Sequence, residues 1–401
     1  QSHVSYFLTD HATSQETRLR LVLEGKSLQA MVSHESPWWN LFQHGMEVMA
    51  HLEWGESKAG PFDGMTDANS WHWQDLVSRG LSPTALGIYA QCPMRYWMGQ
   101  VLKLQGARGP LSKEFPSRMW GELVHSVLCQ MYQDLSLHGW PQHAINPVEL
   151  SGMVKSKMND VFQEYAQRFG KGYELIWEWM RTRLTRMMCS LIDRDHSDFI
   201  EQGWIPVEYE AEAVGALPRE DHAQAELLNI RGRFDRVDKL RDQSRVRIVD
   251  YKISMRRSFR TDELDLVTKA LQGRQLQPPL YSFMTPINLK SETGQDETDP
   301  ISIQSVDFLY LRPMQEESVR SASFSGAIWD TATGEQLRRT IYGWIQEIRA
   351  GQFFILPGTY CQTCQYASAC RFQHHPSWLR AYVHPLAKTY RQIRKQKVSD
   401  D

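Results

Sequence analysis

The sequence predicts an α/β protein in which a central mixed β-sheet is flanked by helices and preceded by a helical N-terminal segment. Residues 147–168 and 173–202 carry apolar side chains at helical spacing over long stretches. They are followed by four short runs of β-branched or alternating residues, which are typical of strands. These runs lie at 205–213, 227–240, 246–253 and 301–311. A hydrophobic share of 41% supplies enough apolar side chains for a packed core.

Helix start and stop signals place the remaining helices. The Ser-Pro pair at 82–83 is a typical helix start, and helical spacing follows it. A second helix is expected to open near Trp120, and a third to cover 262–285. A helix over 333–350 is expected to end at the glycine that follows it, as helices often do.

Composition divides the chain into three predicted parts. Residues 1–80 are expected to be helices and loops, with a Gly-, Pro-, Asp- and Ser-rich passage at 56–70 that we interpret as a linker. Residues 81–372 contain the predicted sheet and form the main domain. Residues 373–401 form a C-terminal tail. Because the first residue is Gln1 rather than Met, we expect the chain to be cut from something longer.

The overall charge and the cysteine content limit the class of protein. A net charge of −2 does not by itself call for a nucleic acid, so any phosphate contact must come from local basic patches. No apolar run approaches the roughly 20 residues that a membrane helix needs, and we expect no membrane partner. Six cysteines in a chain of this length do not make a secreted disulfide scaffold. A cytoplasmic location and a metal centre fit this usage better.

Acidic and basic side chains emerge together from two of the predicted strands. Asp250 and Lys252 are two residues apart on a half-buried strand, so they point to the same face, with Tyr251 turned away. If this strand forms a hairpin with the preceding one, Asp235 comes close to both. Two carboxylates suit a hard cation such as Mg²⁺, and a lysine can orient the attacking water or stabilise negative charge. An Asp-x-Lys triplet alone is also common on exposed strands.

Three further residues are candidates of lower specificity. His125 lies on an apolar helix, where a single histidine is more often a hydrogen-bonded core residue than a ligand. Gln277 and Tyr281 are four residues apart and would share one face of a helix. Together they can hydrogen-bond a phosphate or the catalytic carboxylates, or they can be an ordinary surface glutamine and core tyrosine.

Four cysteines frame the predicted main domain. Cys361, Cys364 and Cys370 lie close together, and Cys92 is far upstream. Four thiolates suit either a zinc ion or an iron–sulfur cluster, and the spacing alone leaves both open. Either would connect the two ends of the domain. Cys129 and Cys189 lie within apolar helical patterns and are interpreted as core thiols.

The order of these motifs resembles a known family. The motifs are Gly121-x-x-x-His125, Gly232-x-x-Asp235-Arg236-x-Asp238, Asp250-Tyr251-Lys252 and Gln277-x-x-x-Tyr281. Over about 81–372 they resemble the RecB-like branch of the PD-(D/E)XK nuclease superfamily. The cysteines narrow the resemblance to its iron–sulfur members: the AddB nuclease domain of bacterial helicase–nucleases and the CRISPR-associated RecB-like exonucleases. The sequence departs from the superfamily's name at one position, because Phe234 replaces the proline before Asp235.

The resemblance implies a role for each candidate. His125, Asp235 and Asp250 would bind Mg²⁺ or Mn²⁺, Lys252 would be the catalytic lysine, and Gln277 and Tyr281 would support the site. A further acid on the first strand would be Glu210, with Glu208 competing for that place. The four cysteines would bind a [4Fe–4S] cluster that closes the nuclease domain. Arg256, Arg257 and Arg260, just after the lysine, are the expected DNA contacts.

The function implied is a metal-dependent DNA exonuclease acting on single strands within a helicase–nuclease for DNA end processing and recombinational repair. Its partner would be a helicase subunit or a covalently linked helicase domain, to which residues 1–80 would lead. Two alternatives remain at this point. One is a non-catalytic iron–sulfur module that binds DNA or acts as a scaffold. The other is a free-standing CRISPR-associated exonuclease.

Overall fold

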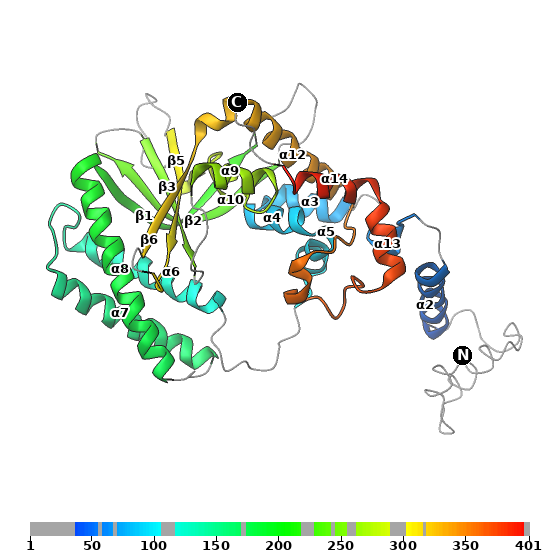
Figure 1. Ribbon diagram of the computed structural model, residues 1–401, viewed down its shortest axis with the longest axis horizontal. Helices are drawn as coiled ribbons and strands as arrows, with labels where there is room; N and C mark the ends of the chain where they lie inside the picture. The colour runs from blue at the N-terminus through cyan, green and yellow to red at the C-terminus, as the bar shows by residue number, and fades with distance from the viewer. Residues whose placement is uncertain are drawn as a thin grey trace, which may run out of the picture.

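The structure is a computed structural model whose centre is a six-stranded mixed β-sheet (Figure 1). It describes residues 37–54, 58–66, 70–105, 117–169, 174–217, 228–241, 245–254, 262–288, 302–315 and 318–396. The strand order is β4-β1-β2-β3-β5-β6, and β3 with β5 is the parallel pair among antiparallel neighbours. The predicted α/β class with a mixed sheet is therefore confirmed. The strands are β1 (Trp204–Ala216), β2 (Asn229–Leu240), β3 (Arg245–Ile253), β4 (Met284–Pro286), β5 (Ser302–Leu311) and β6 (Val319–Ser325).

Strand β3 illustrates why these residues form the middle of the sheet. It pairs with β2 as the predicted hairpin and with β5 on its other side, and its core residues are buried on both faces. Val246 and Ile248 pack into one hydrophobic core, whereas Val249 packs into the other. A strand covered on both faces needs buried side chains on each side, and Val246, Ile248 and Val249 provide them. Ion pairs satisfy the buried charges of Arg247 and Asp250.

Three long helices cover one face of the sheet, as the left side of Figure 1 shows. They are α6 (Ser117–Leu137), α7 (Pro147–Phe169) and α8 (Glu174–Gln202). The predicted helices over 147–168 and 173–202 agree with α7 and α8 within a residue at each end. No helix in the described part of the chain is both long and apolar enough to cross a membrane.

Shorter helices build the second core against the opposite face. They are α3 (Ser70–Arg79), α4 (Pro83–Gln91), α5 (Pro93–Tyr96), α9 (Glu263–Leu271), α10 (Gln277–Tyr281) and α12 (Ala332–Arg349). Trp344 of α12 and Tyr89 of α4 are among the largest fully buried side chains of this core. Ser82 caps α4 by accepting a hydrogen bond from the backbone N–H of Ala85 at 3.1 Å, as the Ser-Pro start predicts.

The structure differs from the sequence prediction in two ways: two of the predicted helices are interrupted, and strands β4 and β6 were not predicted. The helix expected after Ser82 ends at Gln91, because the residue before a proline is pushed into extended backbone, and Cys92 has φ −158° and ψ 104°. The helix expected over 262–285 divides into α9, α10 and strand β4, with a break at Gly273, where φ is +68°. Strands β4 and β6 are short and lie at the two edges of the sheet, so their sequences carry little periodicity.

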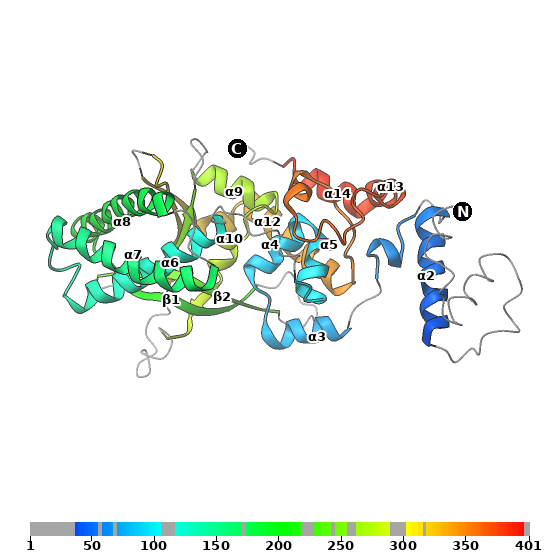
Figure 2. The same cartoon turned by 90° about the horizontal axis from the view of Figure 1, so that it is seen from below.

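The segments at the two ends of the described chain pack on each other. Helix α2 (Pro37–Trp54) and the turn around Asp63 lie beside α13 (His375–Val383), as Figure 2 shows. Arg380 donates to both carboxylate oxygens of Asp63 at 2.9 and 3.1 Å, and neither side chain is exposed by more than 5%. The interpretation of 56–70 as a linker is thus wrong for its described residues 58–66, which are fixed by this buried ion pair.

The C-terminal helices reach the main core. Tyr390 of α14 (Pro385–Ile393) is 1% exposed and donates a hydrogen bond to Glu347 of α12 at 2.6 Å. The division into 1–80, 81–372 and 373–401 stays a prediction. An apolar helical pattern near residue 20 falls outside the described residues.

Candidate active site

The candidate site lies where strands β2 and β3 separate. Their ladder ends at the pair Arg236–Val249, and the next residue on each strand is a carboxylate, Asp235 on β2 and Asp250 on β3. Beyond this fork β2 continues beside β1. Asp235 accepts a hydrogen bond from the backbone N–H of Tyr251 at 2.7 Å in place of a ladder bond. The hairpin thus brings the two predicted acids to one opening in the sheet.

His125 reaches this opening from α6. Its Nε2 lies 3.0 Å from the carbonyl oxygen of Tyr251, and its Nδ1 lies 3.2 Å from a carboxylate oxygen of Asp235. Since a carbonyl only accepts, Nε2 carries a proton, and Nδ1 faces the acid, to which it donates when the imidazole is charged; a neutral imidazole would leave Nδ1 free to bind a cation. Burial lowers the pKa of His125, but the hydrogen bond and charge of Asp235 outweigh it and hold the pKa above its usual value.

Asp250 and Lys252 form a close ion pair on the same face of β3. The lysine Nζ lies 2.5 Å from the Asp250 carboxylate and 4.9 Å from the centre of the Phe308 ring. Asp250 is 2% exposed, and burial raises its pKa to about 6, with a further contribution from the charge of Asp235 and an opposing one from Lys252. The predicted common direction of Asp250 and Lys252 is confirmed by this contact.

Helix α10 fixes the lysine from the other side. Lys252 donates to the side-chain oxygen of Gln277 at 2.9 Å, and the amide nitrogen of Gln277 donates to the hydroxyl of Tyr281 at 3.1 Å. Burial raises the pKa of Tyr281 well above its usual value, so the hydroxyl stays protonated. Gln277 and Tyr281 therefore share one helix face as expected, and in this structure they hold Lys252 rather than a carboxylate.

Glu210 of β1 joins His125 and Asp235 in a compact group of donor atoms, a place that the sequence prediction gave to Asp250. Donor atoms of His125, Glu210 and Asp235 all lie within 4.8 Å of one another. Glu210 has φ +51°, a left-handed conformation that costs a non-glycine residue about 1–3 kcal/mol. It also pairs with Arg233 at 2.7 Å, and burial and Asp235 together raise its pKa. Of the two glutamates considered for this place, Glu210 is the one at the fork.

The left-handed residue also changes which face the strand presents. Tyr209, before Glu210, packs into the core under α6, α7 and α8, whereas Ala211, after it, packs into the opposite core. Strand residues two apart normally share a face, so the backbone turn at Glu210 reverses the pattern. No local sequence signal announces a left-handed glutamate, and this is why the sequence did not separate Glu210 from Glu208.

The four framing cysteines lie on two segments, and Cys92, Cys364 and Cys370 belong to the second core or pack against it. Cys92 lies at the break between α4 and α5, and the other three lie in the loop around the short helix Thr359–Thr363. Burial raises the pKa of the Cys92 thiol, and the charges of Cys361 and Cys364 raise it further. Burial and the charge of Cys92 raise the pKa of Cys370 to about 12. Thiols from opposite ends of the predicted main domain therefore act on one another electrostatically. Cys129 and Cys189 lie apart from them, on α6 and α8.

The predicted DNA contacts Arg256, Arg257 and Arg260 fall outside the described residues. Their role stays a prediction. The metal and catalytic roles of the residues at the fork likewise stay predictions.

Comparison with known proteins places this arrangement in a family. A model of the PD-(D/E)XK nuclease superfamily matches residues 80–371. Three curated relatives are each described as one subunit of an ATP-dependent helicase/deoxyribonuclease. They come from Symbiobacterium thermophilum (24% identical, 83% of this chain and 33% of the relative), Moorella thermoacetica (25%, 65% and 22%) and Carboxydothermus hydrogenoformans (23%, 79% and 33%).

The chain spans a third or less of the length of these relatives. Among solved structures, one described as the crystal structure of SSO0001 aligns at 12% identity with a TM-score of 0.26, covering 62% of this chain and 84% of that one. Since the family match takes in all the strands described above and every residue at the fork, the chain belongs to the PD-(D/E)XK nuclease superfamily.

Proposed function

We propose that this chain is the nuclease part of a helicase–nuclease and hydrolyses phosphodiester bonds of single-stranded DNA with Mg²⁺ or Mn²⁺. The observation that carries the proposal is the donor group of His125, Glu210 and Asp235 beside the Asp250–Lys252 pair. The relatives named helicase/deoxyribonuclease support the DNA substrate and the helicase partner. The preference for single strands and for ends rests on the resemblance to RecB-like nucleases.

The residues at the fork fit a hard divalent cation. Carboxylate oxygens are the ligands that Mg²⁺ and Mn²⁺ prefer, and imidazole suits Mn²⁺ as well. Asp235, Asp250 and Glu210 also place three acids around one opening, which a cation would neutralise. His125, Glu210 and Asp235 would hold the cation, with Asp250 as the predicted further ligand. When bound, such a cation polarises a phosphate oxygen and lowers the pKa of its water.

The protein's own groups then position the reaction. The ammonium of Lys252 is held by Asp250 and Gln277, so it presents a fixed positive charge beside the acids. There it can orient the attacking water and stabilise the negative charge that develops on the phosphate. His125 is oriented through its Nε2–H bond to the carbonyl of Tyr251, which directs Nδ1 toward the cation position.

The cysteines fit a second, structural metal centre, and we propose that it is a [4Fe–4S] cluster. Four thiolates suit either a zinc ion or an iron–sulfur cluster. The preference for the cluster rests on the resemblance to the iron–sulfur members of the RecB-like nucleases. The cluster would connect the break after α4 to the loop after α12 and do no redox work in cleavage.

The direct test is cleavage of labelled DNA by the full 401-residue chain. We expect Mg²⁺ or Mn²⁺ to support degradation of a linear single strand and excess EDTA to abolish it. A covalently closed single-stranded circle should resist, because the proposed enzyme acts from ends. Cleavage of the circle would overturn the exonuclease assignment, and faster cleavage of duplex than of single strands would overturn the strand preference. Cation-loaded protein that cleaves none of these substrates would contradict the proposed function.

A further inference from the structure

The backbone of one residue, Tyr251, holds both candidate ligands at the fork. Its carbonyl accepts the Nε2–H of His125 at 3.0 Å, and its N–H donates to Asp235 at 2.7 Å. The His125 ring also contacts the Tyr251 ring edge-on, with centroids 5.9 Å apart. Any displacement of this residue would therefore move an imidazole and a carboxylate together.

The side chain of Tyr251 packs in the core under α6, α7 and α8, where a buried arginine fixes it. Arg236 Nη1 donates to the Tyr251 hydroxyl at 3.1 Å, and the tyrosine is 4% exposed. Arg236 follows Asp235 directly in the sequence, so two adjacent residues of β2 hold the same residue of β3, one at its backbone and the other at its side chain. One faces the opening, and the other anchors the residue that orients it.

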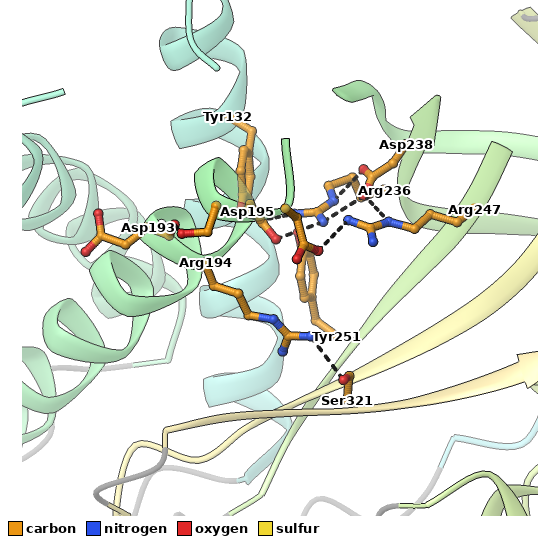
Figure 3. A network of polar contacts seen from close by, with 11 residues as sticks. Tyr132, Asp193, Arg194, Asp195, Arg236, Asp238, Arg247, Tyr251 and Ser321 are labelled. Carbon is orange, nitrogen blue, oxygen red and sulfur yellow. Dashed lines mark hydrogen bonds and ion pairs between the residues drawn. The ribbon is translucent and has the colours of Figure 1, made fainter. Parts of the chain in front are cut away.

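Arg236 is in turn fixed by two buried carboxylates, as Figure 3 shows. Asp195 of α8 accepts from both terminal nitrogens of the guanidinium. Asp238, two residues along β2, accepts a hydrogen bond from Nη2 at 2.9 Å, and its other carboxylate oxygen forms an ion-pair contact with Nε at 2.8 Å. Arg236 and Asp238 have no exposed surface, and Asp195 is 3% exposed.

The network extends beyond this trio at both ends. Asp238 also accepts from Arg247, whose guanidinium pairs with Asp198 at 3.1 Å. Tyr132 of α6 donates to Asp195 from its own hydroxyl. Buried ion pairs are costly to desolvate, and apolar residues of the same volume often stabilise a core as well or better. A purely structural explanation therefore gives little reason to place charges here.

We propose that Asp195, Arg236 and Asp238 are positioning residues, which hold His125 and Asp235 in their cation-binding geometry by anchoring the side chain of Tyr251. This inference rests on the proposed function, because it assigns the buried ion network under α6 and α8 a role in the same site. Partners behind a metal's ligands commonly change metal affinity or activity by about 10- to 100-fold when removed. The positioning role explains why the network of buried charged side chains ends at Tyr251, whose backbone contacts both His125 and Asp235.

The test compares two tyrosine-to-phenylalanine changes in the full chain. Tyr251→Phe removes the hydroxyl that Arg236 holds. Tyr390→Phe is the control, because it removes an equally buried hydroxyl that donates to Glu347 in the other core and has no described contact with the network or the fork. Binding of Mn²⁺ alone is measured by calorimetry, cleavage by kcat and KM for a single-stranded oligonucleotide, and folding by Tm.

We expect Tyr251→Phe to weaken Mn²⁺ affinity by about three- to tenfold and to lower kcat by a similar factor at saturating Mn²⁺, with KM for DNA unchanged. Tyr390→Phe should leave both within about twofold of wild type while lowering Tm about as much as Tyr251→Phe does. Arg236→Lys keeps the positive charge, but a single ammonium cannot contact both carboxylates and the Tyr251 hydroxyl at once. It should therefore lower Mn²⁺ affinity and kcat more than Tyr251→Phe does. If Tyr251→Phe lowers Tm but leaves Mn²⁺ affinity and kcat at wild-type values, the proposal is overturned.

Failure of the proposed function has a different signature. Wild-type protein that binds Mn²⁺ at the fork but cleaves no DNA would overturn the nuclease assignment, while the affinity comparison between the two variants would still decide the positioning role. Wild-type protein that neither binds Mn²⁺ nor cleaves DNA would overturn both.

Discussion

Replacing Lys252 with alanine should reduce the rate of DNA cleavage by about 100- to 1,000-fold, the usual cost of removing one preorganised group that stabilises transition-state charge. The lysine side chain is 30% exposed, and its ammonium is held by Asp250 and Gln277 at the opening of the sheet. Alanine would leave the fork acids in place. We therefore expect Mn²⁺ affinity to be retained or increased, because a positive charge beside the cation position is lost.

The measurement is single-turnover cleavage of a labelled single strand at saturating Mn²⁺, with Mn²⁺ affinity from calorimetry. Lys269→Ala is a matched control. Lys269 pairs with Asp265 at the same 2.5 Å distance, is 29% exposed and lies on α9, and its described ion pair includes no residue of the fork. It should cleave within about twofold of wild type. Unchanged cleavage by Lys252→Ala would assign the activity to another site and would favour the non-catalytic alternative for this one.

Replacing Cys92 with alanine should make the protein insoluble or highly sensitive to protease. The proposed cluster closes a loop that separates Cys92 from Cys361 by most of the domain, and a link over a loop longer than 100 residues contributes about 5 kcal/mol. Total stabilities of domains are about 5–15 kcal/mol, so this loss is a large fraction. Cys92 also lies at the break between α4 and α5, where the chain changes direction.

Anaerobically purified protein should be brown, with visible absorbance from the cluster, and iron and sulfide analysis should account for it. The control variants Cys129→Ala and Cys189→Ala remove cysteines on α6 and α8 that lie apart from the proposed cluster, so they should keep wild-type colour and protease resistance. A soluble Cys92→Ala protein with wild-type iron content would contradict the proposal that Cys92 binds a cluster connecting the two ends of the domain. Colourless wild-type protein that contains zinc would contradict the iron–sulfur assignment.

The parts of the site that were predictable depend on local pattern. Alternation along β2 and β3 predicts which residues share a face, and a short turn predicts that the two strands pair, so Asp235, Asp250 and Lys252 could be placed together. The four-residue spacing of Gln277 and Tyr281 likewise holds within one helix. The order of the motifs then identified the family, although none of them is specific alone.

The parts that were not predictable depend on contacts between distant segments or on unusual backbone. Glu210 owes its place to a left-handed conformation that any glutamate disfavours. Asp195 appears in the sequence as one polar residue of a long helix, and its meeting with Arg236 follows only from how α8 crosses the sheet. The break at Cys92 did have a signal, the proline after it, which helical spacing on both sides concealed.

Anomalous diffraction from crystals soaked in Mn²⁺ would test the central claim most directly. We predict a strong anomalous peak at the fork of β2 and β3, bonded to Nδ1 of His125 and to carboxylate oxygens of Asp235 and Glu210. Data that contain ordered Mn²⁺ elsewhere but no peak between these three side chains would contradict the account.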